Sequence, residues 1–69
     1  MSRMLKVNGE DRTVASATLA ELLREEGVDE TARFVAVALN GAVAPRGEWE
    51  TRALSDGDDV EIVNPVSGG

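Results

Sequence analysis

The sequence predicts an α+β fold in which a mixed sheet of four to five strands carries one helix on one face and continues into a flexible C-terminal tail. A chain of 69 residues is long enough for one small core. Only one segment has helical periodicity, and short strand-like segments meet at two Asn-Gly turns. One helix covers only one face of a sheet, so the other face must meet water or a partner. The domain is expected to span residues 1–63 and the tail residues 64–69.

The first expected element is a β-hairpin. Polarity alternates over 4–7, and the segment 12–14 resumes an extended pattern. Between them, Asn8-Gly9 is the dipeptide that type I′ hairpin turns prefer.

A helix is expected to begin at Thr18. The segment from Thr18 to Glu21 predicts a capping box, in which the Thr18 hydroxyl accepts from the amide of Glu21 and the Glu21 carboxylate reaches back to the amide of Thr18. Gly27 suits a left-handed cap at the end of the helix. One apolar stripe follows from the spacing of three leucines: Leu19, Leu22 and Leu23.

The second half of the chain predicts three more strands. The apolar run 34–39 has the length and β-branched content of a buried strand, and Asn40-Gly41 repeats the turn signal. A short return strand over 42–44 ends at Pro45, and the segment 46–54 is expected to be irregular or a single turn. The last strand is 59–63.

Two aromatic side chains, Trp49 and Phe34, are expected to cover the core rather than to bind a partner. In the last strand, Val60 and Ile62 should face one way and Glu61 the other. The aspartates of residues 56–59 are interpreted as turn formers, because the spaced oxygen donors of an EF-hand are absent from the sequence.

Composition argues against an independent catalyst. The chain has neither Cys nor His, and so lacks the commonest nucleophile, general base and zinc ligand. Its glycines form no P-loop, and no metal site or bound cofactor is expected. The formal charge of -6 disfavours nucleic acid and anionic membranes, although the acidity could equally serve solubility. No apolar run is long enough to span a bilayer and no export signal is visible, so we expect a cytoplasmic protein with protein partners.

The tail pattern suits delivery of its end into another protein. Pro65 restricts its base, and Gly68 and Gly69 present a backbone without side chains, which can enter a passage too narrow for a Cβ. Fully extended, the residues after Val63 reach about 20 Å.

The order strand, strand, helix, strand, strand, strand is that of the β-grasp, the ubiquitin-like architecture. Together with the tail, the chain resembles the ThiS sulfur carrier family of thiamin biosynthesis from Met4 to Gly69. The resemblance is carried by these stretches in this order: 7–9, 18–23, 37–41, Ala44-Pro45-Arg46 followed by Trp49, and 54–58 leading to Gly68-Gly69.

The resemblance implies a protein co-substrate whose reactive residue is Gly69, with Gly68 as spacer. A ThiF-like E1 adenylyltransferase would use ATP and magnesium to adenylate the Gly69 carboxylate. Sulfur from a donor such as a cysteine desulfurase would then displace AMP and leave a thiocarboxylate. A ThiG-like thiazole synthase would accept that sulfur.

The uncovered sheet face is the expected docking platform. Strand alternation gives four candidates there, Met4, Lys6, Glu61 and Val63. The tail adds Pro65, Val66 and Ser67 as residues that a partner would contact.

Three alternatives stay open at this point. The tail from Pro65 to Gly69 also resembles that of MoaD, the related carrier of molybdopterin synthase, whereas Pro45-Arg46, Trp49 and the short length favour ThiS. The same activated end could instead be joined to a target lysine, as in a protein modifier. In the third, the chain is a plain β-grasp interaction module and the glycines are incidental.

Overall fold

The computed structural model describes residues 2–64 and confirms the predicted α+β class. One five-stranded mixed sheet has the strand order β2-β1-β5-β3-β4. β1 and β5 are parallel and the other neighbours antiparallel. In chain order the elements are β1 (Arg3–Val7), β2 (Glu10–Val14), α1 (Leu19–Glu25), β3 (Ala36–Leu39), β4 (Ala42–Val43), the 3-10 turn η1 (Arg46–Glu48) and β5 (Asp59–Val63).

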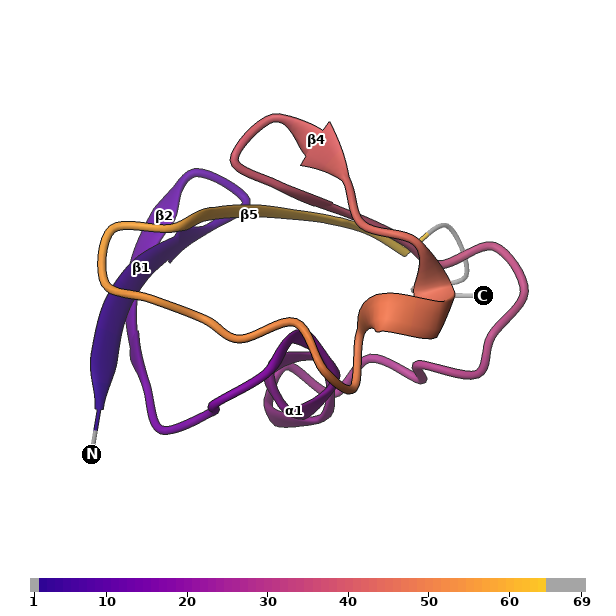
Figure 1. The fold of residues 1–69 in the computed structure, drawn as a ribbon, viewed down its shortest axis with the longest axis horizontal. Helices are drawn as coiled ribbons and strands as arrows, with labels where there is room; N and C mark the ends of the chain where they lie inside the picture. Colours follow the sequence, from indigo (N-terminus) through magenta and orange to yellow (C-terminus); the bar gives the residue numbers. More distant parts are fainter. Residues whose placement is uncertain (1, 65–69) are drawn as a thin grey trace.

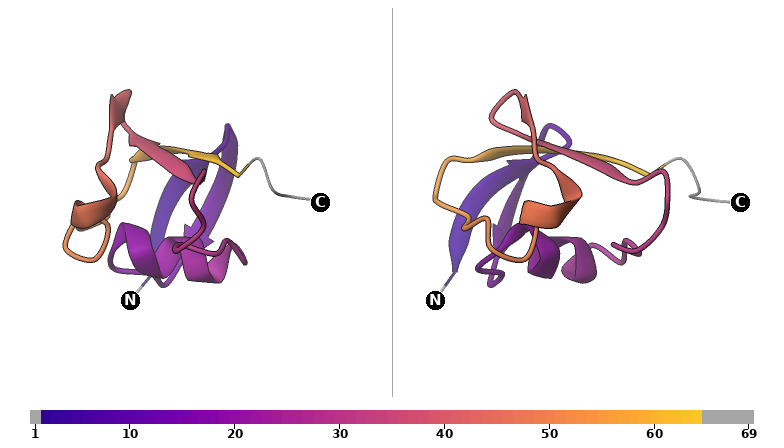
Figure 2. Two further views of the ribbon diagram at one scale, coloured as in Figure 1. Left: turned by 90° about the vertical axis from the view of Figure 1, so that its right-hand side faces the viewer. Right: turned by 45° about the vertical axis from the view of Figure 1, so that its right-hand side comes forward.

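The helix covers one face of the sheet and leaves the other open, as predicted. In Figures 1 and 2, α1 and η1 lie on the same side of the strands, and no other described segment lies across the opposite side. With seven residues, α1 is too short to cross a bilayer, and no helix in the described part of the chain is long and apolar enough to do so.

Both hairpin turns adopt the predicted conformation. Asn8 and Gly9 have φ angles of 52° and 83°, and Asn40 and Gly41 have φ angles of 53° and 85°. Positive φ at both central positions is what a type I′ turn requires, and Asn and Gly tolerate it best.

The two turn asparagines also fasten the central strand β5. The Asn8 side-chain oxygen accepts a hydrogen bond from the Ile62 amide at 2.7 Å. The Asn40 side-chain oxygen accepts from the Asp59 amide at 2.9 Å, and its NH₂ group donates to an Asp58 carboxylate oxygen at 3.0 Å. Both hairpins therefore hold the strand from which the tail continues.

The helix cap is confirmed on one side and differs on the other. The Thr18 hydroxyl accepts from the Glu21 amide at 3.3 Å. The Glu21 carboxylate accepts from the Ala17 amide at 2.8 Å, so the predicted contact with the Thr18 amide is wrong by one residue. Ala17 is held beside Leu54, whose amide donates to its carbonyl at 2.9 Å, and this places the Ala17 amide within reach. Gly27, with φ 76°, ends the helix as expected.

The core lies between α1, the sheet and η1, and Trp49 is inside it as predicted, with 3% of its surface exposed. Val60 is fully buried, Ile62 is partly buried on the same side and Glu61 is exposed. The other buried apolar residues are Leu5, Val7, Val14, Leu19, Ala20, Leu22, Leu23, Val35, Val37, Leu39, Ala44 and Leu54.

The prediction for Phe34 is wrong, because 67% of its surface is exposed. The strand begins at Ala36 rather than at Phe34, and its side chains alternate instead of being buried throughout. Val35 and Val37 point into the core, and the two-residue period of an extended chain then turns Phe34 outward.

Candidate functional site

The candidate site is the end of β5, from which the tail continues. β5 lies between β1 and β3, and Val63 pairs with Ala36 of β3. The predicted site residues Pro65, Val66, Ser67, Gly68 and Gly69 lie outside the described residues. The structure therefore defines the surface at the base of the tail.

All four predicted docking residues of the sheet lie on the open face. Met4 and Val63 are 62% and 56% exposed, and Lys6 and Glu61 are also exposed. They do not form one cluster, because Lys6 pairs with Asp59 at the beginning of β5 whereas Val63 ends that strand. Four residues of strand separate these two levels by about 13 Å.

Two of the four, Glu61 and Val63, line a shallow and largely apolar hollow, which we call the outer hollow. It is lined by Ala36, Val37, Ala38, Val43, Glu61 and Val63. Val43 is 77% exposed and Val63 is 56% exposed, so two exposed aliphatic side chains share this hollow. The sequence interpretation missed Val43, Ala36 and Ala38. The alternation of the 35–39 segment could have indicated Ala36 and Ala38, but placing Val43 requires the register Ala38↔Val43.

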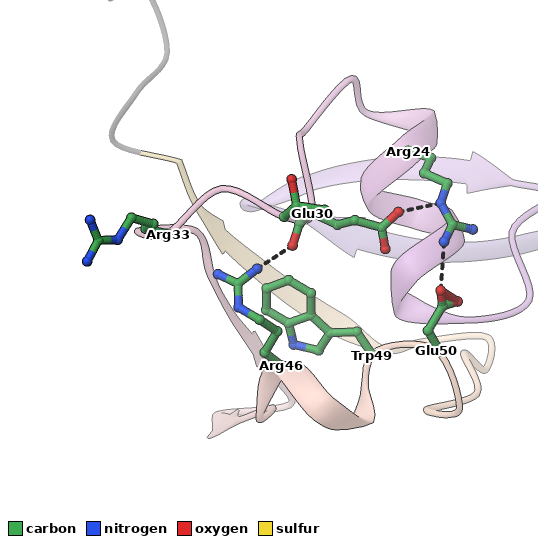
Figure 3. A pocket seen from close by; sticks show the side chains of 7 residues that line it. Arg24, Glu30, Arg33, Arg46, Trp49 and Glu50 are labelled. Atoms are coloured by element: carbon green, nitrogen blue, oxygen red, sulfur yellow. Dashed lines mark hydrogen bonds and ion pairs between the residues drawn. The ribbon is translucent and has the colours of Figure 1, made fainter.

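A second hollow lies on the helix side, and we call it the Arg46 hollow (Figure 3). Arg46 stacks on the Trp49 ring with 4.7 Å between its guanidinium carbon and the ring centroid. The same guanidinium donates to the backbone carbonyls of Glu30, Ala32 and Val35. The lining residues are Arg24, Glu30, Thr31, Arg33, Arg46, Trp49 and Glu50.

Most polar groups of the Arg46 hollow are bonded within the chain, and Arg33 is the exception among its charged side chains. Arg24 donates to the Glu30 carboxylate at 2.5 Å and to the Glu50 carboxylate at 2.8 Å (Figure 3). These two hydrogen bonds raise the pKa of Arg24 above its ordinary value. The Trp49 indole N–H donates to the Ala44 carbonyl at 2.8 Å. This side of the molecule is held together by internal contacts and leaves few groups free for a ligand.

Next to this hollow, the Asp29 carboxylate bonds to Thr31 within the loop that follows α1. It accepts hydrogen bonds from the Thr31 hydroxyl at 2.6 Å and from the Thr31 amide at 2.9 Å, which lowers the pKa of Asp29. Within residues 2–64, no three acidic, His or Cys side chains converge on a point that could hold a metal ion.

The chain matches the model of the ThiS family over residues 5–69, which includes both terminal glycines. The chain belongs to the ThiS family. A protein named sulfur carrier protein ThiS from Thermus thermophilus is 42% identical over 66 residues, and the match covers 96% of this chain and 100% of that protein. The Escherichia coli protein of the same name is 33% identical over 55 residues, or 80% of each chain.

A longer relative is a thiazole synthase from Paramagnetospirillum magneticum. It is 44% identical over 66 residues, which are 94% of this ThiS-family chain and 20% of that protein. The chain thus spans about a fifth of that relative's length.

The fold is also that of a solved ThiS structure. The crystal structure of a thiamine biosynthesis protein (ThiS) from Geobacter metallireducens has a TM-score of 0.75 and 38% sequence identity, covering 96% of this chain and 99% of that one. Its solution structure gives a TM-score of 0.74. These matches confirm the predicted β-grasp architecture.

Proposed function

We propose that this ThiS-family chain is a sulfur carrier protein whose Gly69 carboxylate is the C-terminus of the working protein and carries the sulfur as a thiocarboxylate for thiazole synthesis. The observation that supports this best is the family match, which extends through residue 69. By family, the chain is a carrier and a co-substrate rather than a catalyst.

The chemistry begins with activation, because a free carboxylate is a poor electrophile. A Gly69 carboxylate oxygen attacks the α-phosphorus of ATP, and pyrophosphate leaves. A sulfide-level nucleophile, released from the donor's persulfide by a thiol reductant that becomes a disulfide, then attacks the acyl carbon, the C–O bond to AMP breaks, and Gly69 is left as a thiocarboxylate. ATP and magnesium belong to the activating enzyme, and the tail glycines leave the acyl carbon unshielded by a Cβ.

The described residues contribute a rigid base for that tail. β5 has a neighbouring strand on each side, and the Asn8 and Asn40 carboxamides bond to its backbone. The outer hollow begins at Val63, so we propose it as the part of the open face that partners contact first. Glu61 lines this hollow, and Met4 and Lys6 extend the same face beyond it.

Thiazole synthase is the proposed sulfur acceptor. In the Paramagnetospirillum relative, a segment similar to 94% of this chain forms part of a polypeptide named thiazole synthase. Such a combination supports thiazole rather than molybdopterin synthesis. A ThiF-like adenylyltransferase and a sulfur donor such as a cysteine desulfurase complete the proposed partners, and the need for ATP favours a cytoplasmic carrier.

Intact mass spectrometry tests the proposal. The chain is incubated with a ThiF-like enzyme, ATP, magnesium and a sulfur donor, and its mass should rise by the difference between sulfur and oxygen. A chain lacking Gly69 is the matched control and should keep its mass. An unchanged mass in the intact chain, with the same enzyme active on another ThiS protein, would refute the sulfur carrier function. Isopeptide-linked conjugates in place of the thiocarboxylate would favour a protein modifier.

A further inference from the structure

Most of the basic side chains in this acidic protein already have partners. The chain has seven Lys and Arg residues against thirteen Asp and Glu. Three arginines form ion pairs with carboxylates, Arg12, Arg24 and Arg52. Two more, Arg3 and Arg46, donate to backbone carbonyls. Within residues 2–64, only Lys6 and Arg33 lack an ion pair and a side-chain hydrogen bond.

Arg33 lies at the end of the sheet from which the tail continues. Ala36 pairs with Val63, so residues 33–34 precede β3 at the same end of the sheet at which β5 finishes. Figure 3 shows the Arg33 side chain extending away from Arg46 and Trp49. Lys6, the other unpaired cation of the described residues, lies level with the opposite end of β5.

Phe34 accompanies Arg33 on this surface. Its ring is 67% exposed, and the Arg33 guanidinium carbon lies 5.9 Å from the ring centroid. A mostly exposed Phe beside an unpaired Arg has the composition of an interface hot spot, where aromatic and Arg side chains are enriched. Neither side chain is required by the core, which Val35 fills at this level.

The length of the tail limits where a partner can bind. The six residues after Val63 span at most about 20 Å, whereas the molecule measures 32 Å along its longest axis. An enzyme that holds Gly69 in its active site must therefore approach the end of β5, the end of the sheet at which residues 33–34 also lie.

We propose that Arg33 and Phe34 form a docking contact for the enzyme that adenylates Gly69. Its surface beside the active-site entrance would offer an apolar recess to Phe34 and a carboxylate to Arg33. A carboxylate suits this contact because Arg33 is the one cation near the base of the tail that has no ion pair among the described residues. The attraction between the two would orient this acidic chain on the surface of the enzyme. The inference rests on the proposed function. It adds two residues that would determine how tightly the chain binds the enzyme in the first step, the adenylation of Gly69.

Steady-state kinetics of pyrophosphate release test the inference. Phe34→Ala and Arg33→Glu should each raise the KM for the carrier about tenfold, leave kcat within about twofold, and leave the thermal midpoint unchanged. Arg33→Gln should give a smaller rise and a weaker dependence of KM on salt. Arg12→Glu, a charge reversal on the edge strand β2, is the control and should keep the wild-type KM.

The outcomes separate the inference from the function. If the wild-type chain releases no pyrophosphate, the proposed function fails. If it reacts and both variants keep its KM, the docking contact alone is refuted. A large loss of thermal stability in Phe34→Ala would show that Phe34 stabilises the fold. A defect confined to sulfur transfer would show that the acceptor enzyme makes the contact. Either result would overturn the inference.

Discussion

The two hollows of this protein differ in how their side chains are used. In the Arg46 hollow, Arg46 and Arg24 are bonded to backbone carbonyls and carboxylates of the same chain. In the outer hollow, Val43 and Val63 are exposed. The residues that are easiest to recognise in the sequence, Pro45-Arg46 and Trp49, thus stabilise the fold. The small apolar side chains of the open face remain available to partners.

If this contrast is correct, Trp49→Ala should have the largest effect on stability. Removing a buried Trp should cost about 3–5 kcal/mol, which approaches the total stability of a small domain. Trp49→Phe keeps much of the apolar volume, loses the indole bond to the Ala44 carbonyl and should cost about 1–3 kcal/mol. Chemical denaturation measures both. A cost below about 1 kcal/mol for Trp49→Ala would show that the Arg46 hollow is not needed for the fold.

Arg46→Ala should come next, at about 1–2 kcal/mol, because its exposed guanidinium joins three loop carbonyls and the Trp49 ring. Arg46→Lys keeps the charge but lacks the planar group that donates to several carbonyls and stacks, so most of the loss should remain. Full stability in the Lys variant would mean that charge alone matters there.

The two turn asparagines, Asn8 and Asn40, should differ in how much they stabilise the sheet. Asn40→Asp should cost about 1 kcal/mol at neutral pH, because a carboxylate would replace the NH₂ group that donates to Asp58. Asn8→Asp should cost less than about 0.5 kcal/mol, since Asn8 only accepts from the Ile62 amide. In Asn40→Asp, the introduced carboxylate and that of Asp58 repel each other only while both are charged, so the difference between the two variants should shrink in acid. Equal costs at neutral pH would contradict this account.

Val43→Thr should leave stability within about 0.5 kcal/mol, because the residue is exposed and the β-branched shape is kept. Its expected effect is a several-fold weaker interaction with the activating enzyme or with thiazole synthase, measured by calorimetric titration. Wild-type affinity for both partners would remove the outer hollow from the docking surface.

The smallest effect concerns Asp29, whose pKa is lowered by the Thr31 hydroxyl and amide. A carboxyl with a lowered folded-state pKa stabilises the fold above its unfolded pKa, and this contribution is lost as the pH falls through the folded pKa. Thr31→Val removes the hydroxyl donor and should move the pKa of Asp29 upward in an NMR titration. An unmoved pKa would show that the amide bond alone is responsible.

Local signals made much of the fold predictable from the sequence. The two turns and the two ends of the helix are set by residues that act on the backbone next to them: Asn-Gly at both turns, Thr18 and Gly27. Their conformations therefore depend little on the rest of the chain. Phe34 was mispredicted because the direction of its side chain depends on where β3 enters the sheet.

The site was less accessible to prediction. The open-face residues of single strands could be found by alternation, but the outer hollow combines β3, β4 and β5, whose neighbour relations come from long-range pairing. The three carbonyls bound by Arg46 belong to a loop without periodicity, so no sequence pattern indicated them.

Transfer of labelled sulfur from the loaded chain to the thiazole product tests the central claim most directly. The chain is first loaded with isotopically labelled sulfur at Gly69, purified away from the activating enzyme, and then given to thiazole synthase with its other substrates. We predict that the label appears in the thiazole product while the chain returns to its original mass, one sulfur for each chain consumed. Unlabelled product, with the label still on the chain, would contradict its role as the sulfur carrier.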